Sequence, residues 1–153
     1  MRARPPRVRG TQSGRVRRGA AGRARHRLGG GLTASPSSDD AAAAALAHRI
    51  ALLALDKKAN EVVILDVRGK TSYADYFLIA SGDSERQVAA ITEHIETQLR
   101  SDGVRPLGIE GQERCQWVLL DFGGVVVHLF YDEVRAFYDL EGLWTDVPRE
   151  RVA

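Results

Sequence analysis

Two adjacent glycines between two apolar segments constrain the fold of this chain more than any other feature. Gly123 and Gly124 separate "WVLLDF" (117–122) from "VVVHLFY" (125–131). A glycine pair between two segments rich in β-branched and aromatic residues predicts a hairpin with a two-residue turn. Such a turn sets the register of both strands, and the register decides which side chains share a face.

The two faces of this hairpin differ in character. Side chains alternate along a strand, so one face is wholly aliphatic and is predicted to be core: Val118, Leu120, Val127 and Leu129. The other face pairs Trp117 with Phe130, Leu119 with His128, and Asp121 with Val126. Two interpretations of this mixed face stay open. It is either a second core face beneath the last helix or a partly open recognition surface, because interfaces favour aromatic anchors with a few polar groups.

The rest of the chain alternates helix-type and strand-type patterns. Helices are predicted over about residues 41–59, 84–102 and 132–143, and strands over 61–67, 76–81, 106–110, 117–122 and 125–131. Ser84 stands three residues before Gln87, which is the spacing of a capping box, and Gly103 suits the end of the same helix. This order predicts one compact α/β (α+β) domain with a mixed, about five-stranded sheet flanked by helices.

Charge divides the chain at residue 38. Residues 1–38 hold ten arginines, no lysine and no acidic residue, whereas residues 39–153 hold 12 basic and 20 acidic residues, a net charge of −8. We expect the first segment to be disordered, because it has little apolar surface to bury. Three origins stay open for it: an RNA-binding arm, an organelle transit peptide, or sequence translated from a start site that is not the natural one.

Residues 39–146 are predicted to form the domain, and residues 147–153 a short C-terminal tail. The domain's negative charge favours a basic partner, and direct contact with nucleic acid is expected to be minor and confined to the arginine-rich segment. The single cysteine, Cys115, excludes an intrachain disulfide, and no apolar run reaches the ~18 residues that a bilayer-spanning helix needs. We therefore expect a cytoplasmic protein that does not bind membranes, with an organelle matrix as the alternative.

Acidic and histidine side chains give only weak signals of catalysis. Asp66, Asp75 and Asp121 flank or end strands, but a nucleotidyl transfer site that holds divalent metal needs a closer pair of acids. His128 stands near Asp121 across the hairpin, where it would suit a base with its orienting carboxylate, and a structural or interface role is the alternative. We expect no catalytic residue, no metal site and no cofactor.

The segment "FYDLEGLW" (137–144) carries more large apolar side chains than one helix face can bury. Leu140 and Leu143 are expected to close the core. Tyr138, Glu141 and Trp144 are then left beside the mixed face of the hairpin, where they would remain available to a partner.

Four motifs in order resemble the ribosomal silencing factor family, also called Iojap. They are "LDKKANEVVILDVRGKTSYADYFLIASGDSERQVAAI", "PLGIEG", "WVLLDFGGVVVHLF" and "RAFYDLEGLW", and the resemblance covers roughly residues 46–146. It implies a compact fold similar to that of nucleotidyltransferases, without known catalysis. It also implies binding to the large ribosomal subunit through its basic ribosomal protein fourteen, which blocks joining of the small subunit and lowers translation when nutrients are scarce.

The resemblance also implies that family members are often homodimers when free, and that organellar relatives act in maturation of the large subunit. A nucleotidyltransferase-like enzyme and a large-subunit assembly factor are therefore kept as alternative functions. With the mixed face and the last helix taken as the docking surface, the expected partner contacts are Trp117, Leu119, Asp121, His128, Tyr138, Leu140, Glu141 and Trp144, with Asp75 and Tyr76 added. Glu141 or Asp121 is expected to pair with a basic side chain of the partner.

Overall fold

Six strands form one mixed sheet in the computed structural model, which describes residues 38–153. In chain order the elements are α2 (Ser38–Asp56), β1 (Asn60–Asp66), β2 (Tyr76–Gly82), α3 (Glu85–Ser101), β3 (Gly108–Glu110), β4 (Trp117–Asp121), β5 (Val125–Tyr131), α4 (Asp132–Tyr138), the 3₁₀ helix η1 (Leu140–Trp144) and β6 (Arg149–Arg151). The disorder and the roles predicted for residues 1–38 fall outside the described residues, except for Ser38, which begins α2.

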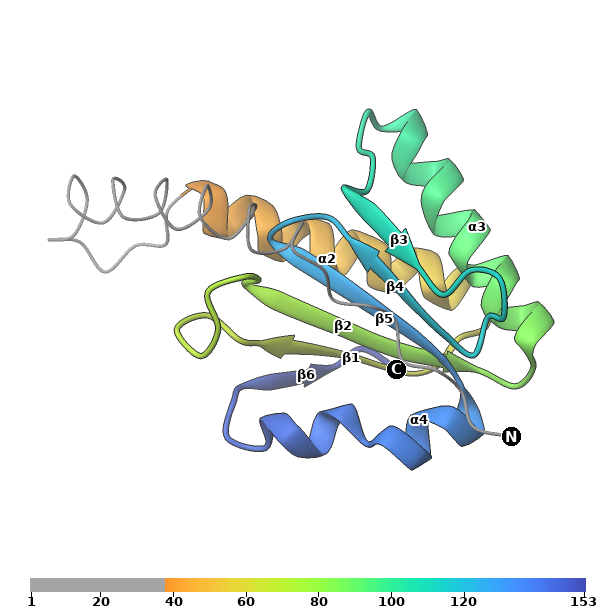
Figure 1. The fold of residues 1–153 in the computed structure, drawn as a ribbon. Helices are drawn as coiled ribbons and strands as arrows, with labels where there is room; N and C mark the ends of the chain where they lie inside the picture. Colours follow the sequence, from red (N-terminus) through yellow and green to blue (C-terminus); the bar gives the residue numbers. More distant parts are fainter. Residues whose placement is uncertain (1–37) are drawn as a thin grey trace, which may run out of the picture.

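The strand order across the sheet is β3-β4-β5-β2-β1-β6 (Figure 1). β2 and β5 pair in parallel, and every other neighbouring pair is antiparallel. The long pairing of β2 with β5 joins the hairpin β4–β5 to the hairpin β1–β2, so that the two most apolar parts of the chain meet in the middle of the sheet. The predicted α/β (α+β) class and the mixed sheet are confirmed.

The register predicted from the glycine turn is also confirmed. Trp117 lies opposite Phe130, and Leu119 lies opposite His128. The Phe122 backbone N–H donates to the carbonyl oxygen of Val125 over 2.9 Å, which closes the turn.

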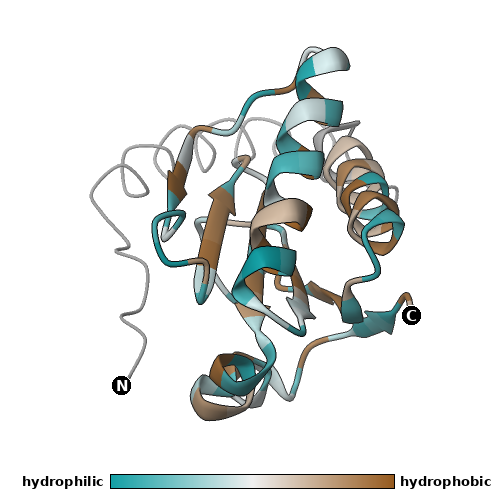
Figure 2. Cartoon of the chain, turned by 90° about the vertical axis from the view of Figure 1, so that its right-hand side faces the viewer, coloured by the Kyte–Doolittle hydropathy of each residue, from teal (hydrophilic) through white to brown (hydrophobic). Residues whose placement is uncertain are grey.

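Helices lie against both faces of the sheet, as Figure 2 shows from the side. On one face α2 and α3 cover the aliphatic side of the hairpin, and all four predicted core residues of that side are fully buried there. On the other face α4 and η1 cover a second, smaller core built on Phe77, Leu119, Val126 and Phe130. β1 contributes to both cores, which explains why "VVIL" within it is apolar without interruption.

The start of α3 agrees with the capping residues in the sequence. The Ser84 hydroxyl accepts a hydrogen bond from the Gln87 backbone N–H over 3.0 Å, and the Gln87 side-chain oxygen accepts one from the Asp83 N–H over 2.6 Å. This is the reciprocal arrangement that the spacing predicts, with the return bond one residue earlier than in the usual capping box.

Two predicted boundaries are wrong. The sheet has six strands instead of five, because Arg149–Arg151, predicted as part of a tail, pair with β1 as β6. The last helix does not run from 132 to 143, because α4 ends at Tyr138 and a separate 3₁₀ helix follows. Both differences involve short elements, whose patterns are too brief to show a period.

Candidate docking surface

The segment from Asp132 to Trp144, named here the α4–η1 platform, changes direction at Asp139. Asp139 adopts a left-handed backbone conformation with φ 47° and ψ 53°, which ends α4 after two turns. Its N–H donates to the Arg135 carbonyl over 2.8 Å, and its own carbonyl accepts from the Gly142 N–H over 2.9 Å as η1 begins. Asp tolerates this conformation better than most residues, so the break is a local preference of the sequence.

The break turns Leu140 and Leu143 in opposite directions. Leu140 packs against the second core, as predicted. Trp144 also packs against this core, and its ring lies edge-on to Phe77 with 5.4 Å between ring centroids. Leu143, predicted to be core, is 73% exposed, and Phe137 is 57% exposed. The platform therefore presents a phenylalanine and a leucine to solvent, and neither was among the expected contacts.

A chain of aromatic rings connects the platform to the hairpin. Trp117 at the start of β4 lies 4.8 Å from Phe130 and 4.9 Å from Tyr138, measured between ring centroids, and Tyr138 lies 5.0 Å from Phe137. Trp117 and Tyr138 are half-buried, so each has one side in the core and one side at the surface. Trp117 and Tyr138 thus lie together at the surface, as the sequence predicts, and Phe137 extends the apolar surface outward.

The centre of the mixed face is closed. Leu119, Asp121 and His128 are 3%, 4% and 6% exposed, so the prediction of a partly open hairpin face is wrong for these three residues. The alternative interpretation, a second core beneath the last helix, describes the structure. These side chains lie under the surface that Trp117 and the platform form.

His128 is hydrogen-bonded to Trp117. The Trp117 indole N–H donates to His128 Nδ1 over 3.1 Å, so the ring proton lies on Nε2, which is buried without a hydrogen-bond partner. Burial lowers the pKa of His128 to about 3, and the ring is neutral at physiological pH. Asp121 instead accepts a hydrogen bond from the Gly123 backbone N–H over 2.9 Å at the hairpin turn. The histidine orients the tryptophan that borders the candidate surface.

Glu141 pairs within its own chain, which differs from the partner contact expected for it. Its carboxylate accepts two hydrogen bonds from Arg135, from Nε over 3.0 Å and from one terminal nitrogen over 2.9 Å. The other terminal nitrogen of Arg135 donates to the Ser81 hydroxyl over 3.1 Å and to the Asn60 carbonyl over 3.3 Å. The pair holds the pKa of Glu141 below its usual range. It joins α4 to η1 across the break, and it anchors both to the ends of β1 and β2.

Asp75 and Tyr76 lie apart from the platform. Tyr76 packs against the core beneath α2, and Arg68 lies over its ring at 5.3 Å from the centroid. Asp75 is buried, and its backbone N–H donates to the Gly124 carbonyl over 2.8 Å. The structure does not bring these two residues to the surface formed by Trp117 and Tyr138.

Asp66, one of the acidic side chains that gave a weak signal of metal chemistry, is paired with an arginine. Asp66 accepts two hydrogen bonds from the Arg68 guanidinium, over 2.9 and 2.7 Å, and this arginine holds the pKa of Asp66 below its usual range. Within residues 38–153 no three His, Cys, Asp or Glu side chains are grouped so that they would hold a metal ion. No helix in this described part is long and apolar enough to cross a bilayer.

Comparisons with known proteins agree on one family. A family model described as "Ribosomal silencing factor during starvation" matches residues 40–153. Ribosomal silencing factor RsfS of Halalkalibacterium halodurans is 46% identical over 93 residues, which are 61% of this chain and 80% of that protein. The mouse protein named "Mitochondrial assembly of ribosomal large subunit protein 1" is 35% identical over 94 residues, 58% of this chain and 40% of its own length. A crystal structure of a Chromobacterium violaceum protein superposes with a TM-score of 0.62 at 35% identity, over 70% of this chain and 90% of that one.

Acid should destabilise the fold through His128. Its pKa is about 3 in the folded protein and about 6.5 in the unfolded chain, so the unfolded state binds more protons between these values. The free energy of unfolding should therefore fall as pH falls, by up to ~1.4 kcal/mol per pH unit. Urea denaturation between about pH 6.5 and 5, above the range where carboxyl groups titrate, measures this slope. His128→Asn should flatten it, and an unchanged slope in that variant would contradict the assignment.

Arg135→Met should destabilise the protein by about 3 kcal/mol, because Glu141 then keeps a partly buried charge without its partner. The double variant Arg135→Met/Glu141→Met should recover most of that loss, since no charge is left unpaired. Arg49→Met is the matched control: its ion pair with Asp102 is exposed, and its loss should cost less than ~1 kcal/mol. Chemical denaturation measures the free energy of unfolding of all three variants. If Arg135→Met is as stable as Arg49→Met, the Arg135–Glu141 pair does not hold the platform.

Proposed function

This chain belongs to the ribosomal silencing factor family, and we propose that it binds the large ribosomal subunit and, while bound, blocks association with the small subunit. Binding alone produces the effect, since a surface that one protein occupies is closed to the other subunit. Translation falls as a result, and the family description connects this activity with starvation. We place this activity in the bacterial cytoplasm, in keeping with the bacterial relatives.

The observation that carries the docking part of this proposal is the exposed apolar surface of the platform. Phe137 and Leu143 are solvent-exposed, and Trp117 and Tyr138 lie half-buried in the same ring-contact chain as Phe137. Binding energy at protein interfaces concentrates in such aromatic and aliphatic anchors, above all where the anchor is already held in place. Trp117 is held by the hydrogen bond from its indole to His128 and by Phe130, so little conformational freedom is lost on binding.

Charge supports a basic protein as the direct partner, and we propose the large-subunit ribosomal protein fourteen. Residues 39–153 carry 12 basic and 20 acidic side chains. Residues 132–146 hold five acids and one base, but the fold brings Lys70 to Asp146 and Arg149 to the Trp144 carbonyl, so the charge that favours a basic partner is that of the domain as a whole. A domain with this net negative charge attracts a basic protein and is repelled by ribosomal RNA, which favours the protein over the surrounding RNA.

Apart from Asp75 and Tyr76, which lie elsewhere, the expected contact residues divide into two groups. Trp117, Tyr138 and Trp144 reach the surface and are proposed to touch the partner, together with Phe137 and Leu143. Leu119, Asp121, His128, Leu140 and Glu141 support this surface from below. When the protein is free, a second copy of the chain is proposed to cover the same apolar anchors, which would make the dimer and the ribosome-bound form exclusive.

Assembly of the large subunit is the second candidate function. It is favoured by the mouse relative, whose name assigns it to assembly of the mitochondrial large subunit. The two functions differ in when they act. A silencing factor changes the joining of finished subunits, whereas loss of an assembly factor leaves immature large subunits even when nutrients are plentiful.

Sedimentation of purified large and small subunits tests both the block and the surface that produces it. Saturating protein should shift joined ribosomes to free subunits. Leu143→Ala and Phe137→Ala should each weaken binding to the large subunit about tenfold or more, as expected for exposed anchors. Leu52→Ala is the matched control, since Leu52 is also 57% exposed but lies on α2, across the sheet.

Circular dichroism of each variant separates loss of binding from loss of folding. Unchanged subunit joining at saturating protein would contradict the proposed block. Equal weakening by Leu52→Ala and Leu143→Ala would contradict the platform as the docking surface, even if the block itself is observed.

A further inference from the structure

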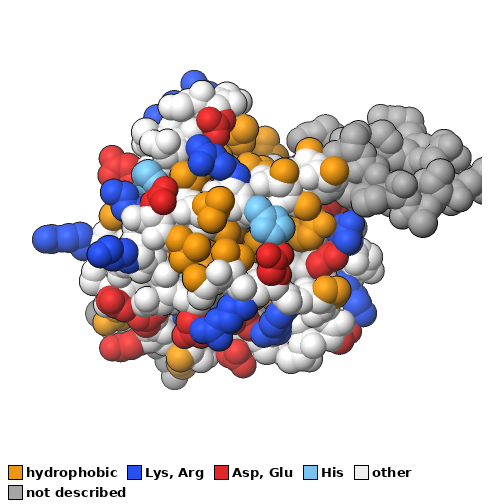
Figure 3. All heavy atoms as spheres, turned by 180° about the vertical axis from the view of Figure 1, so that it is seen from behind, with side chains coloured by type: hydrophobic (Ala, Val, Ile, Leu, Met, Phe, Trp, Pro, Cys, Tyr) orange, Lys and Arg blue, Asp and Glu red, His pale blue; other side chains and the backbone are white. Residues whose placement is uncertain are grey.

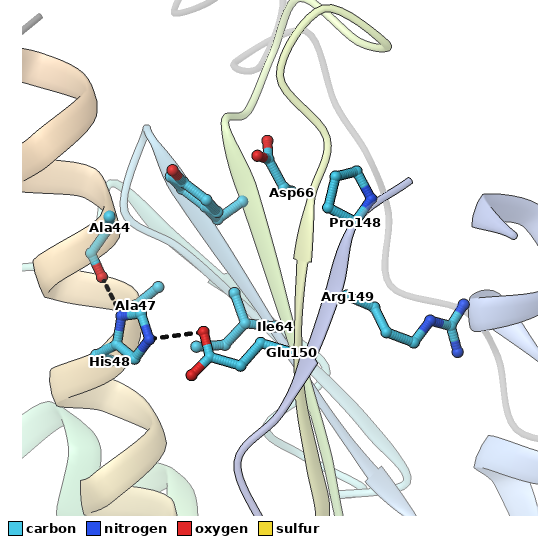
Figure 4. A pocket seen from close by; sticks show the side chains of 9 residues that line it. Ala44, Ala47, His48, Ile64, Asp66, Pro148, Arg149 and Glu150 are labelled. Carbon is cyan, nitrogen blue, oxygen red and sulfur yellow. Dashed lines mark hydrogen bonds and ion pairs between the residues drawn. The ribbon is translucent and has the colours of Figure 1, made fainter. Parts of the chain in front are cut away.

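A cavity of about 240 Å³ lies on the other side of the sheet from the platform. It is open to solvent and is bounded by α2, by β1 and β2, and by β6 with the residue before it (Figure 4). Its floor is aliphatic, formed by Ala44 and Ala47 of α2 and by Ile64 of β1. The alanines create the hollow, because larger residues at the same positions of the helix would fill it.

Two carboxylates lie at the rim of this cavity, one on each of two neighbouring strands. Asp66 is on β1 and Glu150 is on β6, and Tyr76 and Pro148 complete the wall. Figure 4 shows that the Glu150 side chain points toward His48 of α2, whereas the Arg149 side chain points away from the cavity. Figure 3, the view from behind, shows apolar side chains gathered in the middle of this side of the molecule with charged groups around them. The cavity thus combines an apolar floor with an acidic rim.

His48 makes contacts that only its protonated form can satisfy together. Its Nδ1 lies 2.9 Å from the Ala44 carbonyl oxygen, and its Nε2 lies 2.8 Å from the Glu150 carboxylate. Both partners are acceptors, so both ring nitrogens must donate, and a neutral ring has a single N–H. The carbonyl of Ala44 and the carboxylate of Glu150 accordingly raise the pKa of His48 above its usual value. An imidazolium therefore neutralises the Glu150 carboxylate at the mouth of the cavity.

We propose that this cavity binds the cationic side chain of an arginine or lysine from a basic polypeptide, with its aliphatic stem on Ala44, Ala47 and Ile64 and its charged head on Glu150 in place of His48. The stem matches the apolar floor, since these side chains bury their methylene groups while the charge stays near water. The acidic excess of residues 39–153 supplies the long-range attraction for such a segment.

Binding at Glu150 is then linked to release of a proton from His48. The incoming cation and the imidazolium compete for one carboxylate, so affinity should rise with pH through the range in which His48 loses its proton. By the same linkage, the bound cation should lower the pKa of His48. Neighbouring charges do not replace this competition: Asp66 is paired with Arg68, and the Arg149 side chain points away.

This site stands independently of the proposed docking of the platform on the ribosome, because the sheet separates the two. If the cation site is not found, the proposal of ribosome binding still stands. If ribosome binding is not found, the proposal of the cation site still stands.

NMR titration of the full chain with n-butylguanidinium tests the site, with neutral n-butylurea as the isosteric control. The cation should cause saturable shifts of the Ala44, Ala47 and Ile64 methyl signals, and the urea should not. Affinity should be about threefold or more higher at pH 8 than at pH 6, and the pKa of His48, read from its ring protons, should fall on saturation. Glu150→Gln should abolish binding, whereas Arg149→Gln, on the same strand with its side chain turned away, should not weaken it.

A second arm uses the peptide acetyl-Gly-Arg-Gly-amide in place of the free cation. Binding of the peptide at the same methyl groups supports the side chain of a polypeptide as the natural occupant, and binding of the free cation alone overturns that assignment. Equal shifts with n-butylurea, shifts that persist in Glu150→Gln, or a His48 pKa that does not move would each overturn the proposed cation site.

Discussion

The pairing of β4 with β5 is the constraint on which the rest of the structure depends. Once two glycines form the turn, every side chain of the hairpin is assigned to a face. The aliphatic face goes under α2 and α3, and the mixed face goes under the platform. A shift of the register by one residue would turn the side chains of one strand to the opposite face. Trp117 and His128 would then lie on different faces of the sheet, and the hydrogen bond between them would be lost.

On the mixed face, polar contacts fix the positions of side chains and helices that apolar packing alone would leave variable. The bond from the Trp117 indole to His128 fixes the orientation of a large ring. The Arg135–Glu141 pair fixes the angle between two short helices that are too brief to hold their own positions. Buried polar groups of this kind add little to stability compared with apolar packing, but they select one arrangement among several. These contacts hold the platform against the sheet.

Local sequence signals were sufficient for most of the fold and for part of the site. The glycine turn gave the hairpin register, Ser84 with Gln87 gave the start of α3, and the continuous apolar run gave a strand buried on both faces. The break at Asp139 was not visible, because an aspartate inside a helical pattern has no marker that distinguishes a left-handed residue from an ordinary one. After that break Leu143, which is expected in the core, lies exposed to solvent. The position of Glu141 was missed for the same reason, since the break brings it to Arg135 within its own chain.

The two edges of the sheet affect how molecules of this chain can associate with one another. Open strand edges invite pairing with other chains. Here each edge is a strand of three residues, β3 on one side and β6 on the other, and β6 consists of Arg149, Glu150 and Arg151, all solvent-exposed. A short, charged edge discourages growth of the sheet from one molecule to the next. Association through the edges is thereby disfavoured relative to association through the faces.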